Sequence, residues 1–458
     1  MKPQQIQIKQ GMEMLASHGG LLLIGRLLKS LKLSEYLQAI PDVRCRKPDF
    51  SHADIIHTMI GLIAIGKPDF DAVEYFRRDP VFLVQALGIS GCPSSPTIRQ
   101  RLDLIGQNAD DILKERSASL IKEMAPKLTP IKTKCGDFLP LDLDVSPFDN
   151  SNTKKEGVSW TYKKVDGYAP IFAYLGREGY LVNVELREGR QHCQSGTPNF
   201  LKKTLEAARQ ITDAPILLRM DSGNDSKDNN LIIHESGGIE YIGKRNLRRE
   251  SAQSWAAVAK QNGCIRYETA DKTSWIGMTP VGLNGERLLF PIVYEVVEIR
   301  AKKGQPLLFP ELSVDTYWCS LKEIDPEEVL HLYHDHGTSE QFHSELKSDM
   351  GLERLPSQRF STNSLILVLG MMAYNMLRIL GQQSLEAMKD NDIEDLPRPR
   401  RKPVDRRRIR TVMQDLIYMA GRLIHTGRQA FISFGRINPI SGLMDGILRR
   451  IEAAFLFT

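Results

Sequence analysis

The segment YHDHGTSEQFHSELK, residues 333–347, concentrates residue types that can bind a metal ion or an anion. At helical spacing, His336, Glu340, His343 and Lys347 are separated by four, three and four positions, which predicts that they share one polar helix face. A face with two histidines and a glutamate could bind a transition metal, but no second cluster in the sequence supplies the remaining ligands. A solvated charged face is the alternative interpretation.

Two aspartates follow apolar stretches that are typical of buried strands. Asp144 lies in PLDLDVSPF and Asp221 lies in PILLRMDSG. Functional sites form at the carboxyl ends of adjacent strands in an open sheet, because the loops converge there over one crevice. Period-two alternation puts Asp142 on the same strand face as Asp144, so either of these two carboxylates could be the first acidic ligand. Turn formation without any chemistry is the alternative for each strand end.

A stretch of about 130 residues that is predicted to be helical precedes the strands that carry these aspartates. Residues 1–130 predict helices throughout, since apolar residues recur at three- and four-residue spacing. Near its end, Ser95 can cap a helix that has Pro96 at its first position, which would leave Arg99 and Arg101 exposed. This pattern is typical of the second helix of a helix-turn-helix, and an ordinary surface helix of a bundle explains it equally well.

From about residue 135 the pattern changes to short strands and then to alternation of strand and helix. This alternation predicts a mixed α/β sheet flanked by helices, formed by residues 131–249 and 326–390. Residues 250–325 contain RLLFPIVYEVVEIRA and TYWCSL and predict a β-rich insertion. The most apolar run, residues 365–380, is shorter than the ~20 residues that a membrane span needs and predicts a buried helix.

Composition and charge set the class of protein. The 458 residues predict two or three domains, and 41% hydrophobic with 26% charged residues is typical of a soluble globular protein. A net charge of +5 is too mild to prove a nucleic-acid partner. The six cysteines are scattered and no secretory leader precedes them, so we expect reduced thiols in a cytoplasmic protein.

The carboxy-terminal region, residues 391–458, is predicted to be helical and basic. It includes RPRRKPVDRRRIR, residues 398–410, in which eight basic residues accompany one acid. Such a run suits a phosphate backbone, and a solvated linker is the alternative interpretation.

Taken together, these blocks resemble the DDE transposases of bacterial insertion sequences, in the group with a tyrosine, arginine, glutamate, lysine signature. Tyr333, His336, Glu340 and Lys347 fall at the spacings of that signature, with His336 in place of the arginine. An Asp-x-Ser strand end at Asp144, the RMDSG strand end and the β-rich stretch before the glutamate occur in the same order.

The resemblance implies an RNase H-like mixed-sheet catalytic core with a β-rich insertion, preceded by an α-helical domain and followed by a helical basic tail. Asp144, Asp221 and Glu340 would be the catalytic residues and would hold two Mg²⁺ ions, with Mn²⁺ as a substitute. Asp144 is preferred to Asp142 for its Asp-x-Ser context and its place nearer the strand end. The reaction would be hydrolysis and transesterification at DNA phosphodiesters, without a covalent enzyme intermediate.

Double-stranded DNA is the implied partner, as the terminal inverted repeats of an element and as the target, bound by a homodimer with no membrane involved. Trp318 would stack on a base or, alternatively, belong to the core. Histidine at position 336 lacks the permanent forked charge that an arginine offers a phosphate. The predicted DNA contacts are Tyr333, His336, Lys347, Lys244, Arg245, Arg248, Trp318, Arg99 and Arg101.

Two other activities fit the same residues. One is a catalytically inactive DNA-binding protein derived from a transposase, which the histidine at position 336 favours. The other is an RNase H-like nuclease that cuts DNA without joining strands.

Overall fold

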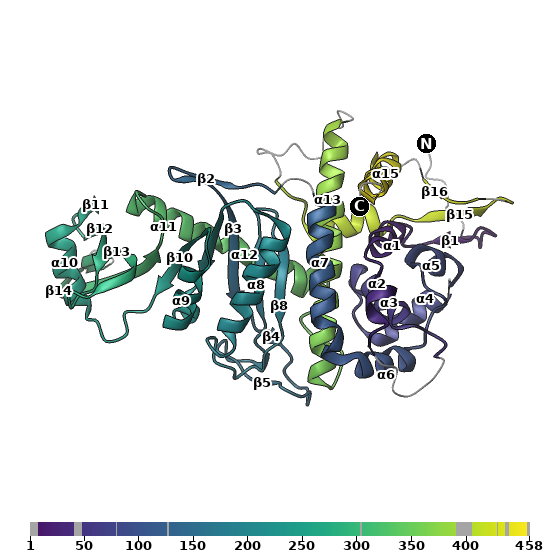
Figure 1. Ribbon diagram of the computed structural model, residues 1–458, viewed down its shortest axis with the longest axis horizontal. Coiled ribbons are helices and arrows are strands. Elements are labelled where there is room, and N and C mark those ends of the chain that lie inside the picture. The colour runs from purple at the N-terminus through teal and green to yellow at the C-terminus, as the bar shows by residue number, and fades with distance from the viewer. Residues whose placement is uncertain are drawn as a thin grey trace, which may run out of the picture. The chain divides into compact units, whose positions relative to one another are not determined.

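The computed structural model of the chain (Figure 1) describes residues 8–40, 48–78, 80–125, 128–302, 305–390, 405–427, 429–435 and 439–455. Contacts divide the chain into two compact units. The helical unit comprises Met1–Ile105 and Met376–Thr458, and the sheet unit comprises Gly106–Asn375. Helix α13 (Phe360–Asp390) belongs in part to each of them.

The helical unit consists mainly of short helices from the two ends of the chain, with one small sheet. Its amino-terminal helices are α1 (Leu21–Ser30), α2 (Leu33–Leu37), α3 (His52–Ala64), α4 (Val73–Arg78), α5 (Pro80–Leu87) and α6 (Ser95–Ile105). Its carboxy-terminal elements are α14 (Ile409–Val412), β15 (Gly421–His425), β16 (Ala430–Phe434) and α15 (Met444–Phe455). Strand β1 (Leu15–Ala16) pairs with β15.

Local sequence explains where these helices begin. Ser51 and Asp54 form a reciprocal capping box at the start of α3, which satisfies two backbone donors that the helix cannot. At α6 the capping hydroxyl is that of Ser94, which accepts a bond of 3.4 Å from the backbone N–H of Thr97. The predicted cap, Ser95, is instead the first helical residue and donates to Asp71.

Two expectations for these terminal regions change. The carboxy-terminal region contains the β15–β16 hairpin as well as helices, because two short apolar stretches pair antiparallel from Gly421 opposite Phe434 to His425 opposite Ala430. Within the basic run, residues 398–404 lie outside the described residues, and Arg407 is buried and bonded to Asp415. Arg101 is also buried, at 8% exposure, because its guanidinium lies 3.1 Å from His52 Nδ1.

The sheet unit is built around one mixed sheet in the order β11-β12-β13-β14-β10-β9-β3-β7-β8, with β2 paired to β3. Its central strands β3, β9 and β10 are parallel to one another, and the other pairings are antiparallel. The strands are β2 (Ile131–Thr133), β3 (Gly136–Val145), β7 (Ile171–Leu175), β8 (Tyr180–Glu185), β9 (Ile216–Met220), β10 (Ile239–Arg245), β11 (Cys264–Glu268), β12 (Lys272–Val281), β13 (Arg287–Lys302) and β14 (Gln305–Cys319).

The β-rich insertion continues this sheet. Strand β14 pairs with β10 through the register Ile242↔Cys319, so β11 to β14 extend the core sheet. Helix α10 (Ala252–Asn262) precedes these strands and lies within the stretch that was predicted to be β-rich. Strands β4 (Phe148–Asp149), β5 (Ser159–Trp160) and β6 (Asp166–Tyr168) form a separate small sheet after β3.

Helices complete the sheet unit, which confirms the mixed α/β fold. They are α7 (Asp110–Met124), α8 (Thr197–Ile211), α9 (Lys227–Glu235), α11 (Pro326–His334), α12 (Ser339–Ser344) and the first part of α13. Helix α13 runs along α7 (Figure 1), and Asn375 on α13 donates to Ser117 on α7 and to the carbonyl of Leu181. Helix α13 is long and apolar enough to cross a membrane, but its most apolar window is entirely buried within the protein.

Candidate active site

The two strand-end aspartates lie side by side in the structure. Strands β3 and β9 are parallel with Leu143 opposite Met220, so Asp144 and Asp221 are the next residues along each strand. Parallel neighbours lie about 4.8 Å apart, which brings both carboxylates to one edge of the sheet. We call Asp144 and Asp221 the aspartate pair.

The electrostatics of the aspartate pair are unbalanced. Burial and the neighbouring charge of Asp144 raise the pKa of Asp221 above its ordinary value, although Asn224 donates a bond of 2.8 Å to Asp221 Oδ1. Burial alone would raise the pKa of Asp144 too, but the hydrogen bond from His343 and the backbone N–H of Val145 lower it. Two adjacent carboxylates of this kind provide hard oxygen ligands whose repulsion a divalent cation relieves, so they fit Mg²⁺ or Mn²⁺.

His343 holds Asp144 in a fixed position. Its Nε2 lies 3.0 Å from Asp144 Oδ2, and its Nδ1 lies 3.1 Å from the hydroxyl of Tyr174. The ring is buried, with its centroid 5.0 Å from that of Phe172. A tyrosine that donates to Nδ1 leaves the proton of neutral histidine on Nε2, where it points to the carboxylate. Tyr174, His343 and Asp144 therefore form one hydrogen-bonded chain.

Asp142 has a different environment, although it lies only two residues before Asp144. Arg219 binds it with both arms of the guanidinium, at 2.6 and 2.8 Å, and also donates to the carbonyl of Leu332. His336 Nδ1 lies 3.1 Å from the same carboxylate. We call Asp142, Arg219 and His336 the neutral cluster. Because Asp142 is 3% exposed and already paired, the geometry favours Asp144 as the first acidic ligand.

Within the neutral cluster, the carboxylate of Asp142 shifts the pKa of His336. Burial alone would lower the pKa of His336, but the Asp142 carboxylate raises it above its ordinary value. The side chain is 8% exposed and engaged with Asp142, so it does not present a surface to a phosphate.

The signature segment is helical but not one uniform α-helix, so the regular spacing behind the predicted shared face of four residues does not hold along it. A 3-10 turn at Asp335–Thr338 separates α11 from α12, and a π-helical turn at Glu345–Asp349 follows. These turns change the angular spacing along the segment. His336 and His343 are buried against two different aspartates, whereas Glu340 is exposed.

Glu340, His336 and His343 do not together form a metal site. In the part of the chain that the structure describes, no group of three His, Cys, Asp or Glu side chains is arranged to hold a metal ion. The transition-metal interpretation therefore gains no support, and Glu340 as the third carboxylate stays a prediction. Tyr333 packs on Tyr317 with ring centroids 4.8 Å apart, and Lys347 Nζ donates to the carbonyl of Pro147 at 2.6 Å.

The basic residues at the end of β10 are paired with acids. Lys244 lies 2.9 Å from Asp315, Arg245 binds Glu250 through both arms, and Arg248 lies 3.4 Å from Asp225. Their predicted contact with DNA stays a prediction.

Trp318 has the environment of a core residue rather than that of an exposed stacking surface. It is 8% exposed, its indole N–H donates to Asp225 at 2.9 Å, and the guanidinium of Arg245 lies over its ring. In the helical unit, Arg99 is exposed and lies over the ring of Phe70.

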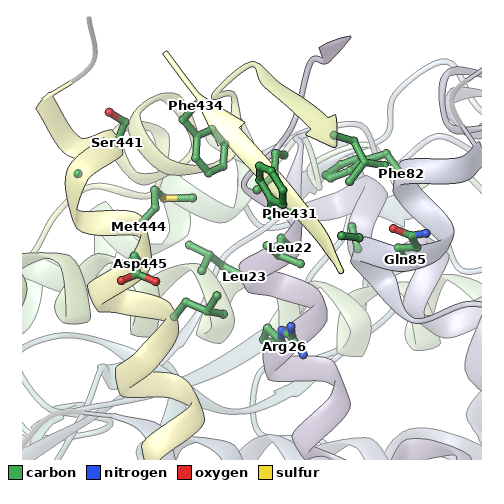
Figure 2. Close-up of a pocket in the computed structure, with 16 residues that line it drawn as sticks. Leu22, Leu23, Arg26, Phe82, Gln85, Phe431, Phe434, Ser441, Met444 and Asp445 are labelled. Carbon is green, nitrogen blue, oxygen red and sulfur yellow. The ribbon is translucent and has the colours of Figure 1, made fainter. Parts of the chain in front are cut away.

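A cavity of about 560 Å³ lies in the helical unit and contains none of the predicted site residues. Figure 2 shows Leu22 and Leu23 of α1, Phe431 of β16 and Met444 of α15 around it. Its lining is largely apolar, with Arg26 and Asp445 among the charged members. The predicted acidic ligands Asp144, Asp221 and Glu340 all lie in the sheet unit instead.

Among solved structures, a piggyBac transposase in a synaptic complex with hairpin DNA is 13% identical, with a TM-score of 0.45, and the match covers 88% of this chain and 80% of that chain. The NurA nuclease from Sulfolobus solfataricus is 10% identical, with a TM-score of 0.20, and the match covers 50% of this chain and 84% of that one. No match was found among curated proteins.

The sequence itself matches the family described as "Transposase DDE domain group 1" over residues 1–272 and 296–455. The unmatched stretch, residues 273–295, falls in β12 and β13 of the insertion. Because the match spans nearly the whole chain, the protein belongs to the DDE transposase domain family, group 1.

Proposed function

We propose that this protein is a DNA transposase that cleaves the ends of its insertion sequence and joins them to target DNA by metal-dependent phosphoryl transfer. Membership of the DDE transposase family supports the reaction class. The observation that carries the proposal is the aspartate pair, in which Asp144 and Asp221 end two adjacent parallel strands without a permanent cation between them. The RNase H-like arrangement of the sheet is consistent with this assignment.

Each residue has a role in the proposed site. Asp144 and Asp221 would hold the metal, with Glu340 as the third ligand. When bound there, two Mg²⁺ ions, or Mn²⁺ in their place, would activate the attacking water or 3′-hydroxyl and stabilise the leaving oxygen. His343 would orient the Asp144 carboxylate through Nε2.

Substrate binding would use the surroundings of the aspartate pair. Lys347 lies against Pro147, three residues after Asp144, and would supply a point charge to a DNA phosphate. The arginine of the family signature is replaced by His336, which is occupied by Asp142. Phosphate binding would therefore depend on Lys347 and Tyr333 rather than on position 336. Because two ends must be cut and joined together, we expect a homodimer on DNA. We expect the protein to act in the cytoplasm.

The test is cleavage and strand transfer on DNA that carries both ends of the element, with products resolved on a denaturing gel. We expect Mg²⁺-dependent cutting at the element boundary and joined products with the wild type. Asp144→Asn, Asp221→Asn and Glu340→Gln should abolish cutting while DNA binding survives. Asp149→Asn, a nearby aspartate that bonds Ser151, is the matched control and should cut normally.

A catalytically inactive DNA-binding protein is the second candidate. It is favoured by the exposure of Glu340 and by the burial of His336. Binding without cutting by the wild type, in Mg²⁺ and in Mn²⁺, would support this candidate. Cutting without joined products would instead identify a nuclease.

A further inference from the structure

A short hairpin beside the aspartate pair carries two exposed aromatic rings. Trp160, at the end of β5, is 61% exposed and Tyr162 is 64% exposed, whereas Thr161 between them is 2% exposed. Of the four tryptophans, all of which lie in the described chain, Trp255 and Trp318 are buried and Trp275 is half-buried. A single exposed apolar side chain is ordinary, but two exposed aromatic rings on either side of one buried residue form a patch of the kind that marks a binding site.

The hairpin is held in a fixed conformation. Thr161 exchanges hydrogen bonds with Val165, and the backbone N–H of Lys164 donates to the carbonyl of Thr161 at 2.9 Å. The backbone of Arg190 donates to Ser159 at 2.9 Å. At Gly189 an added Cβ would lie 2.1 Å from the Ser159 carbonyl, so the chain approaches β5 as closely as only glycine permits. The two rings are therefore presented by a rigid support.

The hairpin also lies next to the reacting groups. The hydroxyl of Tyr162 donates to the carbonyl of Val145 at 2.8 Å, and Val145 directly follows Asp144. Although most of the side chain is exposed, its hydroxyl is partly buried against Val145, which raises the pKa of Tyr162, and the charges of Asp144 and Asp221 add to this shift. A DNA strand whose phosphate lies at the aspartate pair must pass beside this ring.

Two lysines lie at the tip of the hairpin, next to the rings, and the exposed Asp166 pairs with Trp160 across it. Lys163 and Lys164, at the tip of the hairpin, are both exposed. Exposed rings with lysines are the combination that binds single-stranded nucleic acid, since bases stack on the rings and phosphates meet the cations. This charge complementarity favours DNA over an apolar protein partner.

We propose that residues 159–164 form a binding site for an unpaired nucleotide of the DNA strand that enters the active site. The base stacks on Trp160, and Lys163 and Lys164 contact the adjoining phosphates. The inference rests on the proposed function, because it takes the occupant of the aspartate pair to be DNA. It names the part of the DNA that this hairpin reads, which is an opened strand end rather than the paired duplex.

The experiment compares two DNA ends in the absence of cleavage, with Ca²⁺ in place of Mg²⁺. One end is fully paired and the other has three unpaired nucleotides at the element boundary, with 2-aminopurine as the first of them. Affinity is measured by fluorescence anisotropy and stacking by the quenching of 2-aminopurine. For the wild type we expect tighter binding of the unpaired end and strong quenching.

Trp160→Ala should weaken binding of the unpaired end about tenfold, remove the quenching, and change binding of the paired end less than about twofold. Trp160→Phe keeps a ring and should retain most of the affinity and the quenching. Leu231→Ala removes another exposed apolar side chain of the same unit, from α9, and should bind both ends as the wild type does. Lys163→Gln with Lys164→Gln should weaken both ends and reduce their salt dependence.

Equal binding and equal quenching of the unpaired end by wild type and Trp160→Ala would overturn the inference. A loss for Trp160→Ala that is the same for paired and unpaired ends would overturn it as well, since it would assign the ring to the duplex. Both outcomes leave the proposed function intact if the wild type cuts the element boundary in Mg²⁺. If the wild type neither cuts nor binds the ends, the proposed function itself fails.

Discussion

On β3, Asp142 of the neutral cluster lies two residues before Asp144 of the aspartate pair. The two carboxylates have opposite electrostatic surroundings. Asp142 has a bidentate guanidinium and a histidine around it and is 3% exposed. Asp144 and Asp221 have hydrogen-bond donors but share no permanent cation, and burial and repulsion raise the pKa of Asp221. The same residue type is therefore an internal, charge-paired support at Asp142 and a hydrogen-bonded carboxylate without a guanidinium partner at Asp144 and Asp221, where we propose the metal site.

The largest effect should follow from breaking the neutral cluster. Arg219→Met leaves the buried Asp142 without its cation, which we expect to cost about 3–5 kcal/mol in the free energy of unfolding. Urea denaturation at pH 7.5 measures it. Arg248→Met is the matched control, because that side chain is 58% exposed against Asp225 and should cost less than about 1 kcal/mol. A loss for Arg219→Met as small as that of the control would contradict the account.

The next effect concerns the support of Asp144. His343→Ala removes the Nε2–H that holds Oδ2, and we expect the affinity for Mg²⁺ to fall about 10- to 100-fold. Isothermal titration calorimetry with Mg²⁺ measures it on the protein alone. His343→Gln can still donate from its amide and should recover part of the affinity. Unchanged Mg²⁺ affinity in His343→Ala would show that His343 only fills space.

A smaller effect, of opposite sign to that of Arg219→Met, is expected at the aspartate pair. Since burial and Asp144 raise the pKa of Asp221, its charged form costs stability; this cost is absent below the ordinary pKa and grows as pH rises through the raised value. Without metal at pH 7.5, Asp221→Asn should therefore raise the thermal unfolding midpoint. The expected gain in the free energy of unfolding is about 1 kcal/mol. The exposed Asp213 is the control, and Asp213→Asn should change little.

Adding Mg²⁺ should reverse that order, because only the wild type gains stability from the bound ion. A variant Asp221→Asn that is less stable than the wild type without metal would contradict the repulsion between the two aspartates.

The smallest effect is the pH dependence of the neutral cluster. The pKa of His336 is raised by Asp142 against the opposing effect of burial. Its stabilising contribution is therefore fully present below the ordinary histidine pKa and is lost as pH rises through the raised value. The free energy of unfolding of the wild type minus that of His336→Gln, measured by urea denaturation, should be larger at pH 6 than at pH 8.5. The expected change is less than about 1 kcal/mol. A difference that does not vary with pH would show that the pairing is uncharged.

Much of the site's framework follows from sequence pattern. Apolar strands that end in Asp144 and Asp221 predict a shared sheet edge, and parallel pairing of β3 with β9 brings them there. A mixed α/β sheet flanked by helices follows from the alternation of strand and helix, which is a local signal.

Partners across the sheet are not local and could not be predicted. Arg219 lies in the apolar run PILLRM, and only the register with β3 reveals that it neutralises Asp142. A buried arginine within an otherwise apolar strand was the available signal. The 3-10 and π-helical turns around α12 replace uniform helical spacing, so the separate burial of His336 and His343 could not be derived from a 3.6-residue period.

Manganese binding decides whether the aspartate pair, rather than the neutral cluster, is the metal site. Electron paramagnetic resonance of Mn²⁺ would be recorded on metal-free wild type, Asp144→Asn, Asp221→Asn and the control Asp149→Asn. We expect bound Mn²⁺ in the wild type and in Asp149→Asn, and loss of bound Mn²⁺ in both variants of the aspartate pair. Undiminished Mn²⁺ binding by Asp144→Asn and Asp221→Asn would contradict it.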